Sequence, residues 1–267
     1  MQDKMPSHPN KKLFFFNALS RIIFLLLTPT IFRALNFGFI WHSIYWGTIT
    51  LVVLIWGSMI VISPLFGRIG CGWICFAGTV QDFVSQTSLF KIKWRKPILV
   101  LRVIMIILFF ASSITFFIIN LNAGKISGIQ FNPMFLDMEF NAHYKHVWLF
   151  DITGFILLGM LLERRWACRN LCWMGAICAA GASYSRLLPV IDPQKCNLCG
   201  KCEKDCLVRI PMVDYVKNNY GLVTSSECTI CGKCIESCDR DAIKIRMVWS
   251  RSEYIRRMEM NQDSPPL

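Results

Sequence analysis

The chain has 267 residues, of which 54% are hydrophobic and 17% charged, and it carries a formal net charge of +12. An ordinary globular domain is less apolar and more charged. The apolar excess lies before residue 165, while most of the 13 cysteines lie after it, which indicates a membrane part followed by a redox part. The basic residues flank apolar runs and no nucleic-acid-binding motif accompanies them, so we expect a membrane surface, and no nucleic acid, as their partner.

Four apolar segments predict four transmembrane helices, because each approaches the length that crosses a bilayer. The first lies within residues 13–39 and is interrupted by Pro29; a re-entrant or interfacial helix is the alternative there. The others are expected at residues 48–66, 97–121 and 147–162, with a polar loop at 122–146 between the last two.

Basic residues predict the orientation of these helices. The N-terminus and the segment after the fourth span are basic. The loop between the second and third spans carries five basic residues: Arg68, Lys91, Lys93, Arg95 and Lys96. The positive-inside rule therefore places both termini and this loop in the cytoplasm of a multi-pass protein of the cytoplasmic membrane. We expect a membrane domain at 1–165, a linker at 166–190, a redox domain at 191–248 and a basic, flexible tail at 249–267.

A cysteine motif follows each even-numbered span. The pattern Arg-x-x-Cys-x-x-x-Cys occurs twice, 97 residues apart, with its cysteines at Cys71 and Cys75 and at Cys168 and Cys172. On a continuous helix, thiols four residues apart share one face, so each copy is expected to present two sulfurs. Together the four thiols could bind an iron–sulfur cluster, which would be the third beside the two predicted below, or a metal ion, or they could form a thiol–disulfide switch. The alternative is that they are small packing residues, and we prefer this interpretation for Cys178, which has no partner in the repeat.

The C-terminal part contains the spacing C-x2-C-x2-C-x3-C twice, at an offset of 32 residues. This spacing is typical of bacterial ferredoxins that hold two 4Fe-4S clusters, in which the fourth cysteine of each run ligates the other cluster. A zinc site fits eight thiols at this spacing poorly. The predicted ligands are therefore Cys196, Cys199, Cys202 and Cys238 for one cluster, and Cys228, Cys231, Cys234 and Cys206 for the other.

The same region predicts an α+β ferredoxin domain behind the helical membrane part. Residues 210–223 could supply a strand pair and turn, and residues 242–246 an edge strand. His143 and His146 in the outer loop could border a quinol site, although solvated loop histidines are the commoner case. Arg102 and Asp151, near span ends, are expected to reach the interface.

The twin C-x3-C motifs and the double ferredoxin motif resemble those of the NapH-like membrane polyferredoxins. In that family proline usually follows both motifs, whereas Phe76, Trp173, Leu207 and Asp239 stand at those positions here. The resemblance implies electron transfer between the quinone pool, a cytoplasmic donor and a partner redox protein.

We therefore expect a membrane-anchored electron-transfer subunit rather than a stand-alone enzyme, since no nucleotide-binding or nucleophile motif is present. Membrane, other redox subunits and quinone are the candidate partners. An accessory factor that reduces a metal or thiol on a client metalloenzyme is the alternative, and a redox sensor a weaker one.

Overall fold

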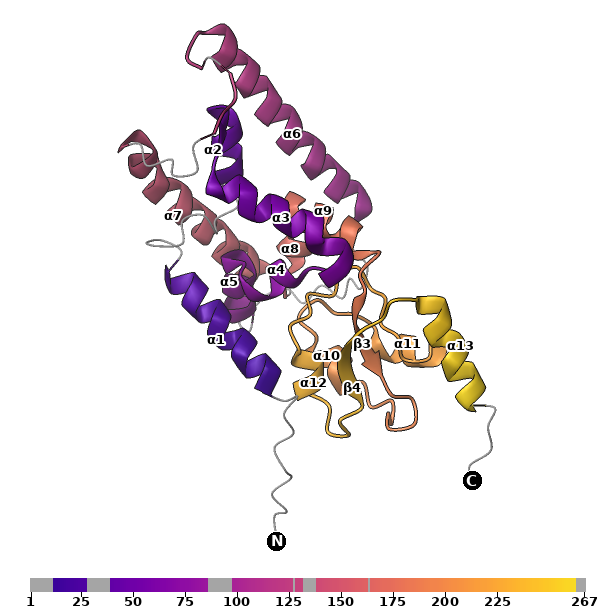
Figure 1. Ribbon diagram of the computed structural model, residues 1–267. Helices are drawn as coiled ribbons and strands as arrows, with labels where there is room; N and C mark the ends of the chain where they lie inside the picture. Colours follow the sequence, from indigo (N-terminus) through magenta and orange to yellow (C-terminus); the bar gives the residue numbers. More distant parts are fainter. Residues whose placement is uncertain are drawn as a thin grey trace. The chain divides into compact units, whose positions relative to one another are not determined.

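The computed structural model describes residues 12–27, 39–85, 98–126, 128–131, 138–162 and 164–262. The chain divides into two compact units. One unit is assembled from the chain up to Ser20, from Ser63–Trp73 and from Ala179 onward; the other comprises Arg21–Ile62 and Ile74–Cys178. Figure 1 labels the helices and strands.

Most of the chain before residue 183 is helical. The helices are α1 (Lys12–Leu27), α2 (Phe39–Tyr45), α3 (Leu51–Phe66), α4 (Ile69–Trp73), α5 (Phe76–Val84), α6 (Leu99–Asn122), α7 (Met138–Leu161), α8 (Trp166–Asn170) and α9 (Trp173–Ala182). Two short parallel strands, β1 (Thr48–Ile49) and β2 (Gln130–Phe131), pair between the helices. Within the second unit, α2 packs along α6, and α5 packs against α7.

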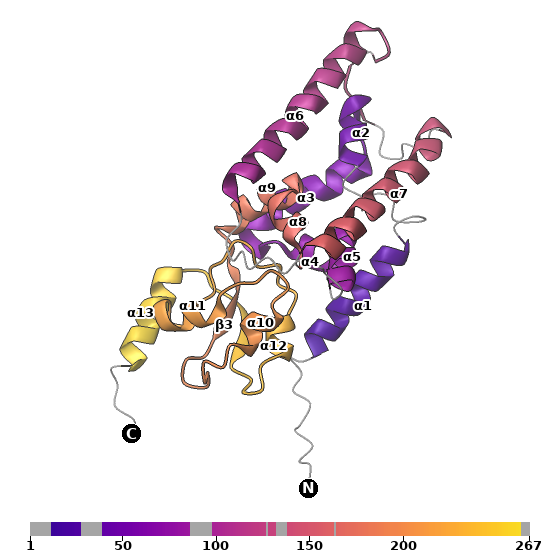
Figure 2. The ribbon, with the colours of Figure 1, turned by 180° about the vertical axis from the view of Figure 1, so that it is seen from behind.

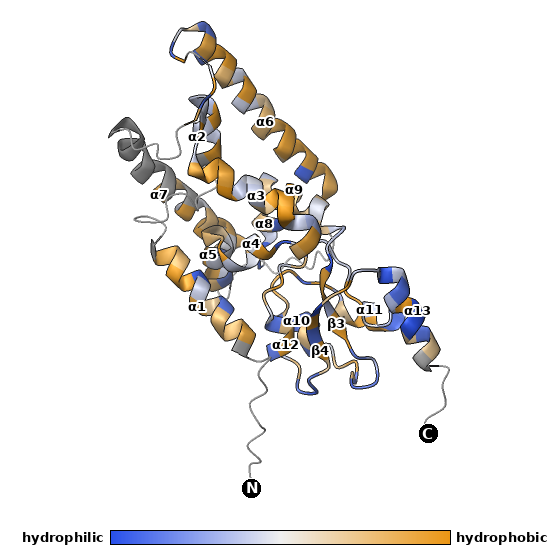
Figure 3. Ribbon diagram, in the orientation of Figure 1, coloured by the Kyte–Doolittle hydropathy of each residue, from blue (hydrophilic) through white to orange (hydrophobic). Residues whose placement is uncertain are grey.

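Helices occur at all four positions where membrane spans are predicted, but their lengths differ. By length and composition, α6 is the one described helix that could cross a membrane; α1, α3 and the described apolar end of α7 are shorter. Figure 3 shows α6 as apolar along nearly its whole length. The polar loop predicted at 122–146 is wrong in its second half, because α7 already begins at Met138. Pro29 and the basic cluster at 91–96 lie outside the described residues.

The core of the second unit forms around Trp56 and Phe76, both buried, with Cys75, Met174 and Cys178 beside them. The rings of Phe109 and Trp173 stack at 3.7 Å between centroids. Charged side chains are also buried here: Arg21 and Arg165 both pair with the carboxylate of Asp82 on α5.

The other unit contains the double cysteine motif. Strands β3 (Leu187–Ile191) and β4 (Ile243–Met247) pair antiparallel, with Ile191 opposite Ile243. Helices α10 (Lys201–Asp205), α11 (Met212–Asn218) and α12 (Lys233–Glu236) surround this pair, and α13 (Arg251–Gln262) follows it. Figure 2 shows α10 and α12 side by side. A core that includes Ile191, Ile210 and Val223 lies among the cysteines.

The edge strand predicted at 242–246 is confirmed as β4, whereas the strand pair predicted at 210–223 is wrong. Residues 212–218 form α11 instead, because Met212, Tyr215 and Val216 recur at helical spacing and pack into the core. Leu222 contributes an isolated bridge to Val190. The start of the tail expected to be flexible forms the helix α13.

Candidate metal centre

The two ferredoxin-type halves have the same backbone conformation. In each half the residue before the second cysteine has a positive φ, 56° at Leu198 and 52° at Ile230, and so does the glycine after it, 70° at Gly200 and 80° at Gly232. Left-handed backbone is unfavourable for residues with a side chain, so a loop that keeps it at Leu198 and Ile230 is held by its surroundings. The two C-x2-C-x2-C runs therefore share one loop conformation.

The fourth cysteines are also matched between the halves. The amide of Ile210 donates a hydrogen bond to Sγ of Cys206 at 3.5 Å, and the amide of Ala242 donates one to Sγ of Cys238 at 3.4 Å. Such bonds stabilise a negatively charged sulfur and are one of the means by which a protein sets the potential of an iron–sulfur cluster. Residues that are 32 positions apart in the sequence thus have matching local structures.

One small cavity is lined by all four thiols of the first predicted set: Cys196, Cys199, Cys202 and Cys238. Cys199 is exposed and the other three are half-buried. Burial, and then the neighbouring Cys238, Cys196 and Cys199, raise the pKa of the Cys202 thiol to about 12. A buried thiol that resists ionisation beside three others fits a site whose irons supply the compensating positive charge.

The second predicted set is more deeply placed, since Cys206 and Cys234 are buried and Cys228 and Cys231 half-buried. Burial raises the pKa of the Cys228 thiol to about 12, with Cys231 and Cys206 adding to the rise and a backbone bond and Arg68 opposing it. Burial, followed by Cys231, Cys228 and Cys206, raises the pKa of Cys234 well above its usual value. These neighbours are the partners predicted from the spacing, while the ligand assignment itself stays a prediction.

Among the described residues no three His, Cys, Asp or Glu side chains lie close enough together to hold a single metal ion. Each thiol of a 4Fe-4S cluster binds a different iron, so the donor set need not converge on one point. The cavity lined by the first four thiols and the amide hydrogen bonds to Cys206 and Cys238 therefore fit the two clusters predicted from the spacing.

The C-x3-C motifs adopt a different local structure from the expected one. Each copy forms a short helix, a break and a second helix: α4 and α5 in the first copy, α8 and α9 in the second. Cys71 lies within α4 while Cys75 is the N-cap of α5, and Cys168 and Cys172 occupy the matching places. The prediction that both thiols of a copy share one helix face is therefore wrong, because the helix ends between them.

The break places one sulfur of each copy at the beginning of a helix. The amide of Gly175 donates a hydrogen bond to Sγ of Cys172 at 3.3 Å, as the N3 amide does to an N-cap side chain. A helix N-terminus stabilises negative charge, which suits a thiolate. Cys75 and Cys172 belong to one apolar cluster, together with the buried Cys178, which is a packing residue as predicted.

The remaining predicted residues lie elsewhere. His143 and His146 fall in α7, where their side chains, like that of Asp151, are outside the described set. Arg102 is buried, and its Nε donates a hydrogen bond to the carbonyl of Arg169, while its position at a membrane interface stays a prediction. Sequence reasoning missed the acidic partners of the motif arginines, Asp82 and Glu227, because long-range pairing leaves no local pattern.

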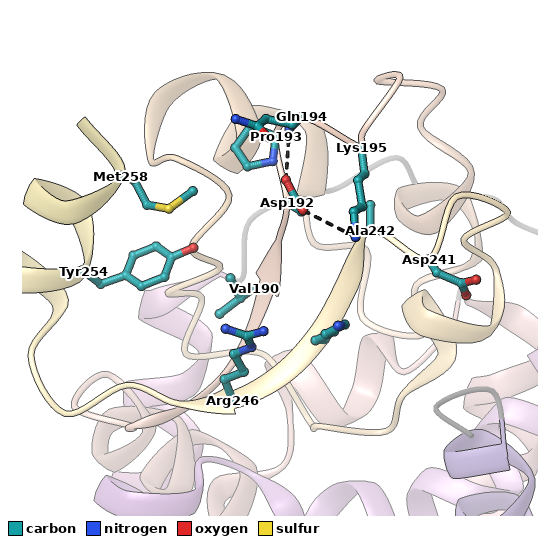
Figure 4. Close-up of a pocket in the computed structure, with 11 residues that line it drawn as sticks. Val190, Asp192, Pro193, Gln194, Lys195, Asp241, Ala242, Arg246, Tyr254 and Met258 are labelled. Atoms are coloured by element: carbon teal, nitrogen blue, oxygen red, sulfur yellow. Dashed lines mark hydrogen bonds and ion pairs between the residues drawn. The ribbon is translucent and has the colours of Figure 1, made fainter. Parts of the chain in front are cut away.

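A larger groove lies beside β4 and α13, and no thiol lines it (Figure 4). It is lined by Lys195, Lys244, Arg246, Tyr254 and Asp192, among others, and carries charges of both signs. This mixture selects no particular class of ligand.

Two family profiles match the chain. A profile described as a 4Fe-4S binding domain matches twice, at residues 48–97 and 146–190, and a 4Fe-4S dicluster domain matches residues 188–239. The double match covers both C-x3-C motifs, and the dicluster match covers the two ferredoxin runs.

Three curated relatives are similar to parts of the chain. YccM of Escherichia coli, provisionally named as an electron transport protein, is 26% identical over 58% of this chain and 45% of its own length. A protein of Methanocaldococcus jannaschii without a functional name is 25% identical over 67% of each chain. The methylamine utilization ferredoxin-type protein MauN of Methylobacillus flagellatus is 26% identical over 79% of this chain and 74% of its own.

The chain thus spans less than half the length of YccM. No solved structure matches. The profile matches agree with the iron–sulfur sites predicted from the cysteine spacing, and the chain is similar to ferredoxin-type proteins.

Proposed function

We propose that this protein is a membrane-anchored subunit that passes single electrons between the quinone pool or a cytoplasmic donor and a partner redox enzyme. One observation carries the proposal: eight thiols in two matched loops occur in the same chain as a helix suited to a bilayer. Iron–sulfur clusters transfer electrons singly, and an apolar anchor keeps such a relay at the membrane.

The surface of α6 supports membrane anchoring. Its large apolar side chains are exposed along both ends and the middle, for example Leu99 at 71%, Ile107 at 59% and Ile119 at 52%. A water-soluble protein rarely leaves so continuous an apolar surface uncovered. We propose that α1, α3 and α7 supply the other three spans, with both termini on the cytoplasmic side, as the distribution of basic residues favours.

Two clusters are proposed for the ferredoxin halves, with the crossed ligand sets given by the spacing. The surrounding residues position the thiols, donate amide hydrogen bonds to Cys206 and Cys238, and exclude water from Cys206 and Cys234. When bound, the clusters supply one-electron chemistry and no bond is made or broken in the protein.

A third cluster at the C-x3-C motifs is part of the same proposal. It would use Cys71, Cys75, Cys168 and Cys172, which are the motif cysteines inside the two matches to a 4Fe-4S binding domain. Cys75 and Cys172 lie at the N-termini of α5 and α9, which favour the negatively charged thiolate that binds iron.

Iron and acid-labile sulfide counted on anaerobically purified protein would test this function. We expect about twelve irons per chain with the third cluster and about eight without it, since each cluster holds four. The double variant Cys71→Ser, Cys168→Ser should lower the higher count by about four, and the matched control Cys178→Ser should leave it unchanged. Fewer than about four irons in the unmodified protein would exclude the proposal.

A further inference from the structure

The segment of residues 68–73, which carries Cys71, packs against the second of the two ferredoxin halves. The Nη1 atom of Arg68 donates a hydrogen bond to Oε2 of Glu227 at 2.9 Å, and both side chains are at least nine-tenths buried. Glu227 directly precedes Cys228, the first cysteine of the second half. A buried ion pair of this kind is costly to break, because it would leave a charge without a partner.

Two further contacts extend this packing in register. The indole nitrogen of Trp73 donates a hydrogen bond to the carbonyl of Ile230 at 3.1 Å. A Cβ built on Gly72 would lie 2.1 Å from the carbonyl oxygen of Thr229, so only glycine permits this approach. On the other side of this segment, the side-chain amide of Asn17 donates a hydrogen bond from Nδ2 to the carbonyl of Gly72 at 2.9 Å. Residues 68–73 are therefore held against residues 227–230 by charge, hydrogen bonds and close backbone contact.

The first half offers an internal comparison, since its residues match those of the second at an offset of 32. The counterpart of Glu227 is Lys195, which is 58% exposed and 3.9 Å from Asp192. The counterpart of Ile230 is Leu198, 43% exposed. A Cβ on Gly232 would meet Leu13 at 3.1 Å, whereas one on Gly200 would meet nothing within 4 Å. The same loop is thus covered in one half and open in the other.

We infer that the second ferredoxin half is the one that lies against the Cys71 segment, residues 68–73, and that Arg68 is the positioning residue that holds this segment against the Cys228–Cys234 loop. This inference rests on the proposed function. It divides the two halves by role: the second half faces the Cys71 segment, and the first half, with Cys199 exposed, is left to exchange single electrons with a soluble one-electron redox protein. One electron moves in each exchange and no proton or bond changes place.

Hydrogen exchange on the full, cluster-loaded chain in detergent tests the positioning directly. Arg68→Met leaves Glu227 buried without its arginine, and Gly72→Ala forces the backbone at Thr229 away. We expect amides in residues 226–235 to exchange at least about tenfold faster in both variants, because their cover is released, while residues 194–203 stay as in the unmodified protein. Arg68→Lys, which keeps the charge, should give a smaller rise.

Matched control variants distinguish the loss of the contacts on residues 226–235 from a general destabilisation of the protein. Lys195→Met changes the counterpart of Glu227, and Gly57→Ala adds a methyl group where nothing lies within 4 Å; neither should affect residues 226–235. Equal faster exchange in both loops, or none in either, would overturn the inference. If Arg68→Met does not fold, Arg68→Lys and Gly72→Ala decide the outcome by the same comparison.

An electron paramagnetic resonance redox titration gives a second readout. Glu227→Gln removes a negative charge next to Cys228, so it should raise the midpoint potential of one cluster and leave the other unchanged. A shift of both potentials, or of neither, would contradict the assignment. Iron content is measured on every sample, so a wrong inference with full iron leaves the proposed function standing, whereas an iron-poor unmodified protein removes both.

Discussion

The carboxylate of Asp82 binds Arg165 through both of its oxygens, with Nε of the arginine 3.0 Å from Oδ1 and 3.1 Å from Oδ2. Asp82 lies on the helix that follows the first C-x3-C motif, and Arg165 opens the second. Arg21 donates to the same carboxylate. One carboxylate therefore bridges two buried arginines and joins the two copies of the motif.

Replacing this acid should be strongly destabilising. Asp82→Asn leaves Arg165, 2% exposed, and Arg21, 6% exposed, without their counter-charge, and we expect a loss of about 3–5 kcal/mol in the free energy of unfolding. Urea titration in mild detergent, followed by circular dichroism, would measure it. Glu253→Gln, which breaks the exposed pair with Arg257, is the control and should cost less than about 0.5 kcal/mol. Equal losses in the two variants would refute this account.

The crossed ligation of the two halves can be tested with pairs of substitutions. If Cys206 serves the same cluster as Cys228, the double variant Cys206→Ser, Cys228→Ser should lose about four irons, as either single variant does. Cys206→Ser combined with Cys202→Ser should lose about eight, because two clusters are then damaged. Iron analysis with resonance spectra would distinguish the cases. The reverse pattern would show that each half ligates its own cluster.

Two glycines with similar backbone angles should differ in their tolerance of a methyl group. Gly200→Ala, at a φ of 70° with open space around it, should cost about 1–2 kcal/mol from the left-handed conformation alone. Gly221→Ala should cost clearly more, since a Cβ there would lie 1.8 Å from the carbonyl oxygen of Ile191. The temperature at which the visible cluster absorbance is lost would rank them. A Gly221→Ala protein as stable as Gly200→Ala would disprove the steric argument.

Alkaline pH should weaken the packing of α13 against the strands. The Tyr254 ring packs against the cluster of Leu188, Val190, Leu222 and Val248, and burial raises the pKa of its hydroxyl above the usual value. The pKa of this hydroxyl is therefore higher in the folded protein than the value of 10.0 that applies to the unfolded chain. The neutral hydroxyl contributes its full stabilisation below pH 10.0, and this stabilisation is lost as the pH rises through the pKa of the folded protein.

Urea midpoints measured from neutral pH upward should therefore decline less in Tyr254→Phe, which keeps the packing and cannot ionise. Tyr184→Phe is the matched control, because Tyr184 is 77% exposed, and it should decline like the unmodified protein. Identical alkaline curves for Tyr254→Phe and the unmodified chain would rule out this contribution.

Local patterns predicted the strand at β4 and the duplication of the C-x3-C unit, which is matched twice by the same family profile. They failed at α11, because a short apolar run suits a strand or a helix until its packing partners are known. They also failed at the C-x3-C motifs, where the helix is interrupted between cysteines that sequence spacing places on one face. Pairings such as Arg68 with Glu227 depend on tertiary structure and leave no trace in a window of sequence.

The unit that contains the ferredoxin halves is built from three separate stretches of chain. Because synthesis proceeds from the N-terminus, Arg68 is made 159 residues before the glutamate that neutralises it. With the proposed crossed ligands, the first half cannot complete its cluster until Cys238, in the second half, has left the ribosome. Delivery of iron to the first half must therefore come after synthesis of the second half.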